Sequence, residues 1–168
     1  INIFFFKRQL LQIKQEGFFA YWRNVWGVRR ILMVPLYILA FPLVVVIRMI
    51  GPWFLVRMGG LISLRIGHFA ANTELYLCER KALINVPKQR YIDLFHMAYR
   101  PICNHQLAIM WKRVLHIWPS WVLAPLLLVN RMIAGGAVHV ISDNTQGDRD
   151  VHNLLDRFPP HLEFSTEE

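Results

Sequence analysis

Hydrophobic positions along this chain change from one long uninterrupted run to short runs separated by amphipathic stretches. The long run, residues 31–47, contains 17 residues and no charge. Farther along, short runs bounded by glycine, proline or polar residues predict strands, at residues 61–66, 91–98, 137–141 and 161–164. Stretches with apolar residues on one face predict helices, at residues 68–83, 104–115 and 150–158. This alternation predicts a Rossmann-like α/β fold with a parallel sheet.

A further stretch, residues 119–133, is apolar almost throughout and contains Pro125. It is short for a membrane span, which needs roughly 17–25 residues. Two interpretations stay open, a buried helix and a second surface that contacts lipid.

The segment at residues 61–77 is the best candidate for chemistry. Its first part predicts a strand covered on both faces, and Gly67 supplies the backbone freedom for a tight turn into a helix. In α/β proteins ligands bind at the carboxyl ends of the strands. The polar residues at or near this end of the strand therefore predict a substrate-binding site, made of Arg65, Asn72 and Glu74 beside His68.

His68 is the candidate catalytic residue at this turn. The positive end of the helix and the nearby Arg65 would both favour a neutral imidazole, which can accept a proton. Two ordinary interpretations stay open. His68 would then be a surface residue that opens a helix, and Asn72 with Glu74 would belong to a solvated helix face.

The net charge of +8 is informative because of its location. Residues 1–65 hold nine Lys or Arg and one acidic residue, whereas residues 66–168 hold ten basic and ten acidic residues. The basic excess therefore surrounds the run at residues 31–47, which reaches the lower limit of about 17 residues for a membrane span. Because basic residues flank the run on both sides, a re-entrant or interfacial helix is slightly favoured over a true span.

Residues 3–28 mix aromatic and aliphatic side chains with Lys and Arg, as in a helix that lies on an anionic bilayer. Packing against a partner subunit is the alternative. The hydrophobic content of 55% argues against nucleic acid as the partner of these basic residues. We therefore expect a segment associated with membrane lipids at residues 1–58 and an α/β domain at residues 59–168.

Motifs for metals and nucleotides are scarce. Cys78 and Cys103 lack metal or redox spacing, so we expect free thiols in a reducing compartment. Asp148 and Asp150 have the D-x-D spacing that can hold a divalent ion, but a helix cap or turn is favoured, and no metal or cofactor is expected. No G-x-S-x-G, P-loop or dinucleotide-glycine pattern occurs, which argues against hydrolases and nucleoside triphosphatases.

The chain ends on a capping box, with Ser165 as the N-cap and Glu168 three residues later. This pattern predicts a helix that begins where the sequence stops. Together with the first residue, Ile1, it leads us to expect the first half of a longer α/β protein. An ordinary frayed tail is the alternative.

Several segments, in this order and spacing, resemble a family of bacterial glycosyltransferases associated with surface-polysaccharide and glycan-modification loci. The resemblance covers the chain from about Arg48 onward. It is carried by residues 63–68 (SLRIGH), 72–77 (NTELYL), 103–104 (CN), 111–113 (WKR), 135–136 (GG), 148–151 (DRDV), 153–155 (NLL), 160–162 (PHL) and 164–168 (FSTEE).

The resemblance implies the N-terminal lobe of a two-lobed GT-B enzyme at the cytoplasmic face of the bacterial inner membrane. Such an enzyme moves a sugar from a nucleotide sugar to a surface-glycan or lipid-linked acceptor. By analogy, His68 would be the base on the acceptor hydroxyl, and Arg65, Gly67 and Asn72 would shape the pocket. The donor lobe would lie outside this sequence, so the chain alone is expected to be inactive. The alternative is a membrane-anchored scaffold subunit that does not depend on His68 or Arg65.

Overall fold

The computed structural model describes residues 28–141 and 150–163. The chain divides into two compact units, residues 1–39 and residues 40–168, and the division falls within the helix α3 (Val28–Ile50). The described part of the first unit consists of the first turns of α3.

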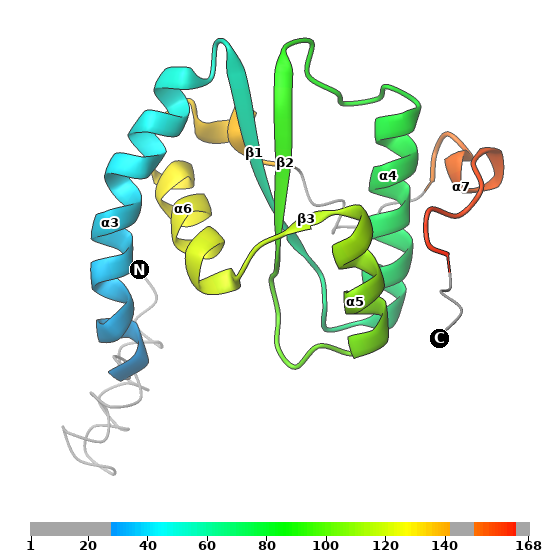
Figure 1. Cartoon of the computed structure of the whole chain (residues 1–168), viewed down its shortest axis with the longest axis horizontal. Coiled ribbons are helices and arrows are strands. Elements are labelled where there is room, and N and C mark those ends of the chain that lie inside the picture. The colour runs from blue at the N-terminus through cyan, green and yellow to red at the C-terminus, as the bar shows by residue number, and fades with distance from the viewer. Residues whose placement is uncertain (1–27, 142–149, 164–168) are drawn as a thin grey trace, which may run out of the picture. The chain divides into compact units, whose positions relative to one another are not determined.

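The core of the second unit is a parallel sheet with the strand order β1-β2-β3 (Figure 1). The strands are β1 (Phe54–Leu61), β2 (Arg90–Met97) and the short β3 (His116–Ile117). β1 is buried along almost its whole length, as expected for a parallel strand covered on both faces. This mixed α/β architecture with a three-stranded parallel sheet is compatible with part of a Rossmann-like fold.

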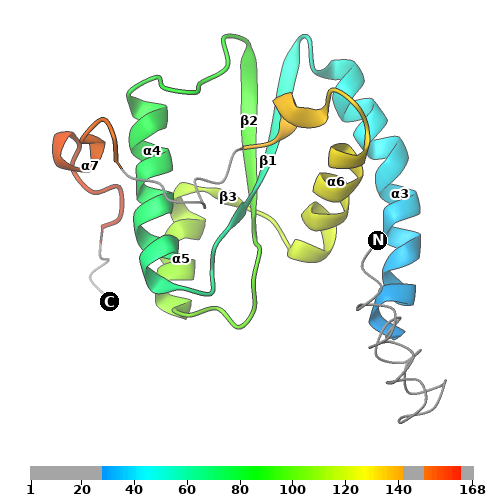
Figure 2. The same cartoon turned by 180° about the vertical axis from the view of Figure 1, so that it is seen from behind.

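Helices cover both faces of the sheet. The π-helical turn η1 (His68–Asn72) and α4 (Thr73–Lys81) connect β1 to β2, and α5 (His105–Val114) connects β2 to β3. The views in Figures 1 and 2 place α4 and α5 on one face and α6 (Ser120–Met132) on the other. The core on the α4 and α5 face is centred on large side chains that are almost completely buried, among them Phe69, Phe95 and Trp111.

After α6 the chain returns to the free edge of β1. It passes through the 3-10 helix η2 (Gly136–His139), and Val140 then forms a parallel bridge with Met58. The backbone N–H of Ile141 donates to the carbonyl of Met58 over 2.9 Å. The segment at Val140 therefore lies on one side of β1 and β2 on the other. The connections through α4 and α5 lie on one face of the sheet and the connection through α6 lies on the other, so β1 borders a topological switch point.

Two contacts fix the ends of the chain in this unit. The Arg48 guanidinium, near the end of α3, donates to the carbonyls of Ile133 and Ala134 just after α6. The C-terminal end of a helix carries a partial negative charge, which stabilises a cation at this position. The short α7 (Leu154–Arg157) packs against α4, and its buried Leu154 lies with Leu75 and Cys78 in a small apolar cluster.

The strand predicted at residues 61–66 is wrong in its position, because β1 ends at Leu61. Gly59 and Gly60 directly precede the predicted strand, as bounding glycines would, but they lie inside β1. A Cβ on Gly59 would lie 3.1 Å from Ile141 and 3.3 Å from Phe95, so the glycine allows these bulky neighbours to approach. β1 consequently runs across the domain boundary expected between residues 58 and 59.

The other predicted elements differ in outcome. The strand near residues 91–98 and the helix near residues 104–115 are confirmed, and the Asn104 side chain accepts from the backbone N–H of Leu107 as an N-cap. The strand predicted at residues 137–141 is wrong apart from one bridge, because η2 occupies most of it. Residues 161–163 form no strand.

Candidate functional site at the carboxyl edge of the sheet

The candidate site lies at the edge where β1 and β2 end and where η1, α5 and α6 begin (Figure 1). Ser63 holds the two strand ends together. Its fully buried hydroxyl donates to the carbonyl of Tyr99 over 2.6 Å, and its carbonyl accepts from the backbone N–H of Cys103 over 2.8 Å. The loops that follow β1 and β2 are therefore joined directly.

Two of the predicted site residues meet at this edge. His68 opens η1, and its Nδ1 lies 3.4 Å from the side-chain nitrogen of Asn72, one helical turn later. Both side chains are half-buried, so each keeps a face toward solvent. Arg65 is exposed in the connecting turn. The arrangement allows a titratable ring and an amide to act together on a ligand.

Gly67 does not have the special conformation that the sequence led us to expect. Its φ of −61° and ψ of −48° are ordinary right-handed helical values, which any residue adopts. A Cβ at this position would meet nothing within 4 Å. The expectation that this turn needs the freedom of glycine is therefore wrong. A role in shaping the pocket would have to come from a ligand that approaches the backbone closely.

Side chains of α4 and α5 bind one carbonyl inside the π-helical turn. The carbonyl of Phe69 accepts from the indole Nε1 of Trp111 over 3.0 Å and from the hydroxyl of Thr73 over 2.8 Å. Such π-helical turns often occur at functional sites, and this one begins at His68.

Glu74 lies away from this pair and binds the C-terminal segment instead. Its Oε1 accepts from the backbone N–H of His161 over 2.9 Å and lies 2.7 Å from Nδ1 of the same residue. The buried thiol of Cys78 is close to both, and these three residues form the one potential metal-ligand group found among the described residues. Glu74 and His161 are bonded to each other here, so the contact anchors the C-terminal segment to α4.

Asp150 is the described member of the D-x-D pair, and Asp148 lies outside the described residues. The Asp150 carboxylate accepts from the backbone N–H of Leu155 over 2.7 Å. Desolvation opposes ionisation, but backbone hydrogen bonds from Leu154, Leu155 and His152 outweigh it and lower the pKa of Asp150. The helix-capping interpretation fits this geometry. The capping box at residues 165–168 also lies outside the described residues.

A second charged cluster, which was not predicted from the sequence, lies inside the sheet. Arg57 of β1 and Asp93 of β2 are register partners, and Nε and Nη2 of Arg57 each donate to Asp93 over 2.6 Å. The hydroxyl of Tyr76, on α4, also donates to Asp93. The signal was present in the sequence as a charged residue inside each of two mainly apolar strands, Arg57 in β1 and Asp93 in β2.

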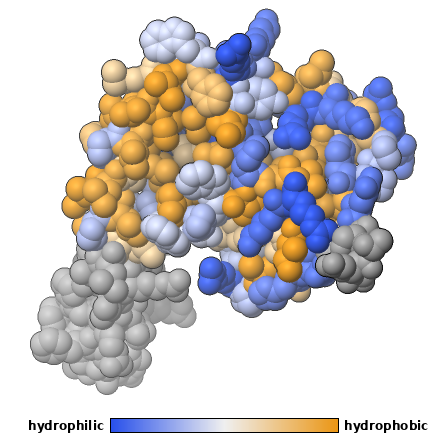
Figure 3. All heavy atoms as spheres, viewed as in Figure 1, coloured by the Kyte–Doolittle hydropathy of each residue, from blue (hydrophilic) through white to orange (hydrophobic). Residues whose placement is uncertain are grey.

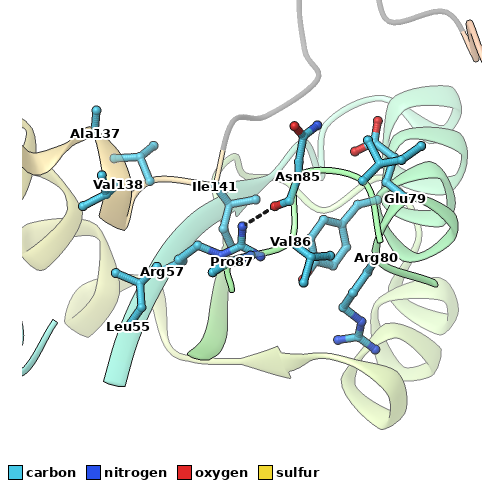
Figure 4. A pocket seen from close by; sticks show the side chains of 13 residues that line it. Leu55, Arg57, Glu79, Arg80, Asn85, Val86, Pro87, Ala137, Val138 and Ile141 are labelled. Atoms are coloured by element: carbon cyan, nitrogen blue, oxygen red, sulfur yellow. Dashed lines mark hydrogen bonds between the residues drawn. The ribbon is translucent and has the colours of Figure 1, made fainter. Parts of the chain in front are cut away.

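The charged groups of this buried cluster are hydrogen-bonded within the protein. Nη1 of Arg57 donates to the carbonyl of Asn85 over 2.8 Å (Figure 4). Burial alone would lower the pKa of Arg57, but hydrogen bonding and the negative charge of Asp93 raise it. Burial, together with the bond to Asp93, raises the pKa of Tyr76. The adjoining cavity, of about 360 Å³, is lined by Asn85 and its neighbours before β2, away from the carboxyl edge.

The described residues include one helix that is long and apolar enough to cross a bilayer, judged by length and composition, at Met33–Ile50. α6 is a shorter apolar helix. It buries one face, including Leu123 and Leu127, and exposes another, on which Trp121 and Met132 are 60% and 77% exposed.

Comparisons of the chain with models of protein families, with curated proteins and with solved structures find no match. The resemblance to glycosyltransferases therefore depends on the residues quoted above and stays a prediction.

Proposed function

We propose that this chain is the acceptor-binding, N-terminal part of a membrane-associated glycosyltransferase of the GT-B type. The reaction would transfer a sugar from a nucleotide sugar to a surface-glycan or lipid-linked acceptor at the cytoplasmic face of a bacterial inner membrane. No metal or other cofactor is part of the proposal. The donor lobe is part of it, and would be supplied by sequence outside this chain.

The observation that carries the proposal is the position of His68. It follows β1, which has β2 on one side and the Val140 bridge on the other, with connecting helices on opposite faces. Doubly wound α/β proteins bind ligands at the carboxyl ends of the strands that border such a switch point. The topology therefore supports a ligand site at the same edge of the sheet that the motif at residues 63–68 suggested from the sequence.

Exposed apolar surface supports the membrane association. Over the last turns of α3 and over α6, large apolar side chains face outward (Figure 3), and they include Phe41, Val46, Met49, Trp121, Leu128 and Met132. Contiguous exposed apolar surface marks a protein interface or a membrane contact. In our proposal, the basic residues that surround the apolar run of α3 favour the membrane over a protein partner.

In the proposed reaction His68 acts as a general base. The acceptor hydroxyl oxygen forms a bond to the anomeric carbon while the bond from that carbon to the diphosphate oxygen breaks. The proton of the hydroxyl passes to Nε2 of His68, and the nucleoside diphosphate leaves with the electron pair. For this step Nδ1 must carry the other hydrogen, and the amide of Asn72, turned so that its oxygen faces the ring, would accept it.

The test uses the full-length protein in membranes, with sugar transfer from a radiolabelled nucleotide sugar as the measurement. General-base catalysis contributes about 10²–10⁴-fold, so H68A should lower kcat by at least about 100-fold. H116A, on the exposed face of β3, is the matched control and should keep the wild-type rate.

Substitutions of Asn72 test whether Nδ1 of His68 carries the ring hydrogen. N72L removes the acceptor for Nδ1–H and should lower kcat by about 10-fold, whereas N72D keeps an acceptor and should restore most of the rate. Turnover of H68A close to that of the wild type would exclude His68 from the mechanism. If a full-length protein of wild-type sequence transferred no sugar from any nucleotide donor while deletion of residues 1–57 abolished its cellular role, the scaffold alternative would replace the proposal.

A further inference from the structure

A second cavity, of about 360 Å³, lies at the carboxyl ends of β2 and β3, between one face of α5 and the beginning of α6. Its polar lining comes from Arg100, His105, Lys112 and Ser120, and the remaining lining residues are apolar, with no acidic residue among them. The cavity is therefore basic without a neutralising carboxylate in its wall.

The basic residues come from two elements that the fold brings together. Arg100 lies in the loop after β2, while His105 and Lys112 are seven residues apart on α5 and thus share one of its faces. All three side chains are exposed. Across residues 28–141 and 150–163, no ion pair or side-chain hydrogen bond engages them. They remain available to a ligand, unlike Arg57.

The beginning of α5 adds to this positive field. Asn104 caps the helix by accepting from the N–H of Leu107, and His105 is the first helical residue at the cavity wall. The N-terminal end of a helix carries a partial positive charge that favours anions. His105 lies at this end, whereas Lys112 is in the last turn of α5, about 10 Å farther along the helix axis. The helix end and the basic side chains attract the same kind of group.

The remaining wall is apolar and includes an aromatic ring. Trp118 and Ile109 line the cavity, and each is about half exposed, at 48% and 49%. The hydroxyl of Ser120 is already committed to the carbonyl of Met97 over 2.7 Å. A ligand for this cavity therefore combines a strongly anionic group with an apolar or ring-shaped neighbour.

We infer that this cavity binds the phosphate or diphosphate group of the acceptor. This inference rests on the proposed glycosyltransferase function and specifies that the acceptor is phosphorylated. Arg100 and Lys112 would pair with the phosphate oxygens, and Trp118 would pack against the group that carries the phosphate. The cavity lies on the same edge as His68, because Ser63 joins the loops after β1 and β2.

Binding is tested with the whole chain in phosphatidylcholine nanodiscs, by calorimetry with inorganic pyrophosphate. Loss of one charged hydrogen bond is expected to weaken binding by about 10-fold or more, so K112Q and R100Q should each raise Kd to that extent. K88Q is the matched control. It removes the same charge from the exposed connection before β2 and should leave Kd unchanged.

A second arm identifies the source of the phosphate. Binding to phosphatidylcholine vesicles is compared with binding to vesicles that also contain a phosphatidic acid. A preference for the latter that K112Q abolishes would support a lipid-linked acceptor, whereas Lys112-dependent binding of pyrophosphate alone would support a soluble phosphorylated acceptor. Equal Kd values for wild type, K112Q and R100Q would overturn the inference, and so would Lys112-dependent binding of single-stranded oligonucleotides in preference to pyrophosphate.

Turnover separates this inference from the proposed function. In the full-length enzyme K112Q should raise KM for the acceptor with little change in kcat, whereas H68A should lower kcat. Pyrophosphate binding that depends on Lys112 in a protein that transfers no sugar would reject the transferase proposal while leaving the anion site in place.

Discussion

Two cavities of about 360 Å³, one beside β1 and the other at the ends of β2 and β3, hold charge in opposite ways. In one, Arg57 is only 9% exposed and donates to Asp93 and to the carbonyl of Asn85. In the other, Arg100 and Lys112 are exposed and unpaired within the described ranges. The two cavities are equal in volume, so they differ in whether their charged side chains have a partner inside the protein.

Position along the strands explains the contrast. Arg57 and Asp93 are the fourth residues of β1 and β2, so their charges are enclosed by the helices on that face and must neutralise each other. Arg100 follows the end of β2, where the backbone leaves the sheet and solvent reaches the side chain. Charge inside this sheet therefore serves the fold, and charge at its carboxyl edge is free for a ligand.

The largest effect is expected from breaking the buried cluster. Removal of one partner of a buried ion pair typically costs about 3–5 kcal/mol, because the remaining charge is left without compensation. R57A and D93N should each lower the free energy of unfolding by that amount, measured by urea titration of the chain in a mild detergent.

The matched control removes both charges together. R57M/D93L should lose clearly less stability than the sum of the single variants, since no lone charge stays buried. Pyrophosphate binding by this double variant should equal that of the wild type. Additive losses of stability, or a binding defect, would contradict the assignment of this cluster to the fold.

A smaller and pH-dependent effect is expected at His96 of β2, which lies between Asp93 and Arg100 in the sequence. Burial lowers the pKa of His96, and the positive charge of Arg131 adds to this, against a backbone hydrogen bond at Met97. The unfolded chain, with an ordinary histidine pKa of about 6.5, therefore binds a proton in a range where the folded protein does not. The free energy of unfolding should fall as the pH decreases below about 6.5.

H96Q removes this titration and should flatten the stability profile between about pH 6.5 and pH 5, relative to the wild type. The measurement is urea unfolding at a series of pH values. A wild-type profile that stays as flat as that of H96Q, or one that rises on acidification, would show that the folded protein protonates this ring readily.

The smallest effect on stability is expected at the carboxyl edge itself. Gly67 has helical backbone angles and open space at the Cβ position. G67A should therefore leave stability unchanged or raise it by about 0.4–1 kcal/mol. Its KM for the acceptor decides whether a ligand approaches this backbone. An unchanged KM would remove Gly67 from the substrate-binding residues.

The sequence predicted the alternation of strands and helices because hydrophobic periodicity follows the local environment of each element. The cap at Asn104 and the strand near residues 91–98 are of this kind. The position of β1 was missed because Gly59 and Gly60 resemble a turn. Only residues distant in sequence explain these glycines inside a strand, since Phe95 and Ile141 approach Gly59 while Ala98 and His96 approach Gly60.

The candidate site was likewise predictable only where it depends on local spacing. The pair of His68 and Asn72 lies within one turn and follows from local spacing. The partner of Glu74, His161, is 87 residues away and could not be inferred from local pattern. The basic cavity likewise depends on tertiary structure, since it combines a loop after β2 with one face of α5.

The most direct test of the central claim is hydrogen–deuterium exchange of the whole chain in phosphatidylcholine nanodiscs, with and without pyrophosphate. The claim is that the carboxyl edge of the sheet, and not the buried Arg57 cluster, is available to ligands. We predict slower exchange at residues 98–113, with no change at residues 79–87 or 137–141. Protection confined to residues 79–87 and 137–141, or no protection anywhere, would contradict it.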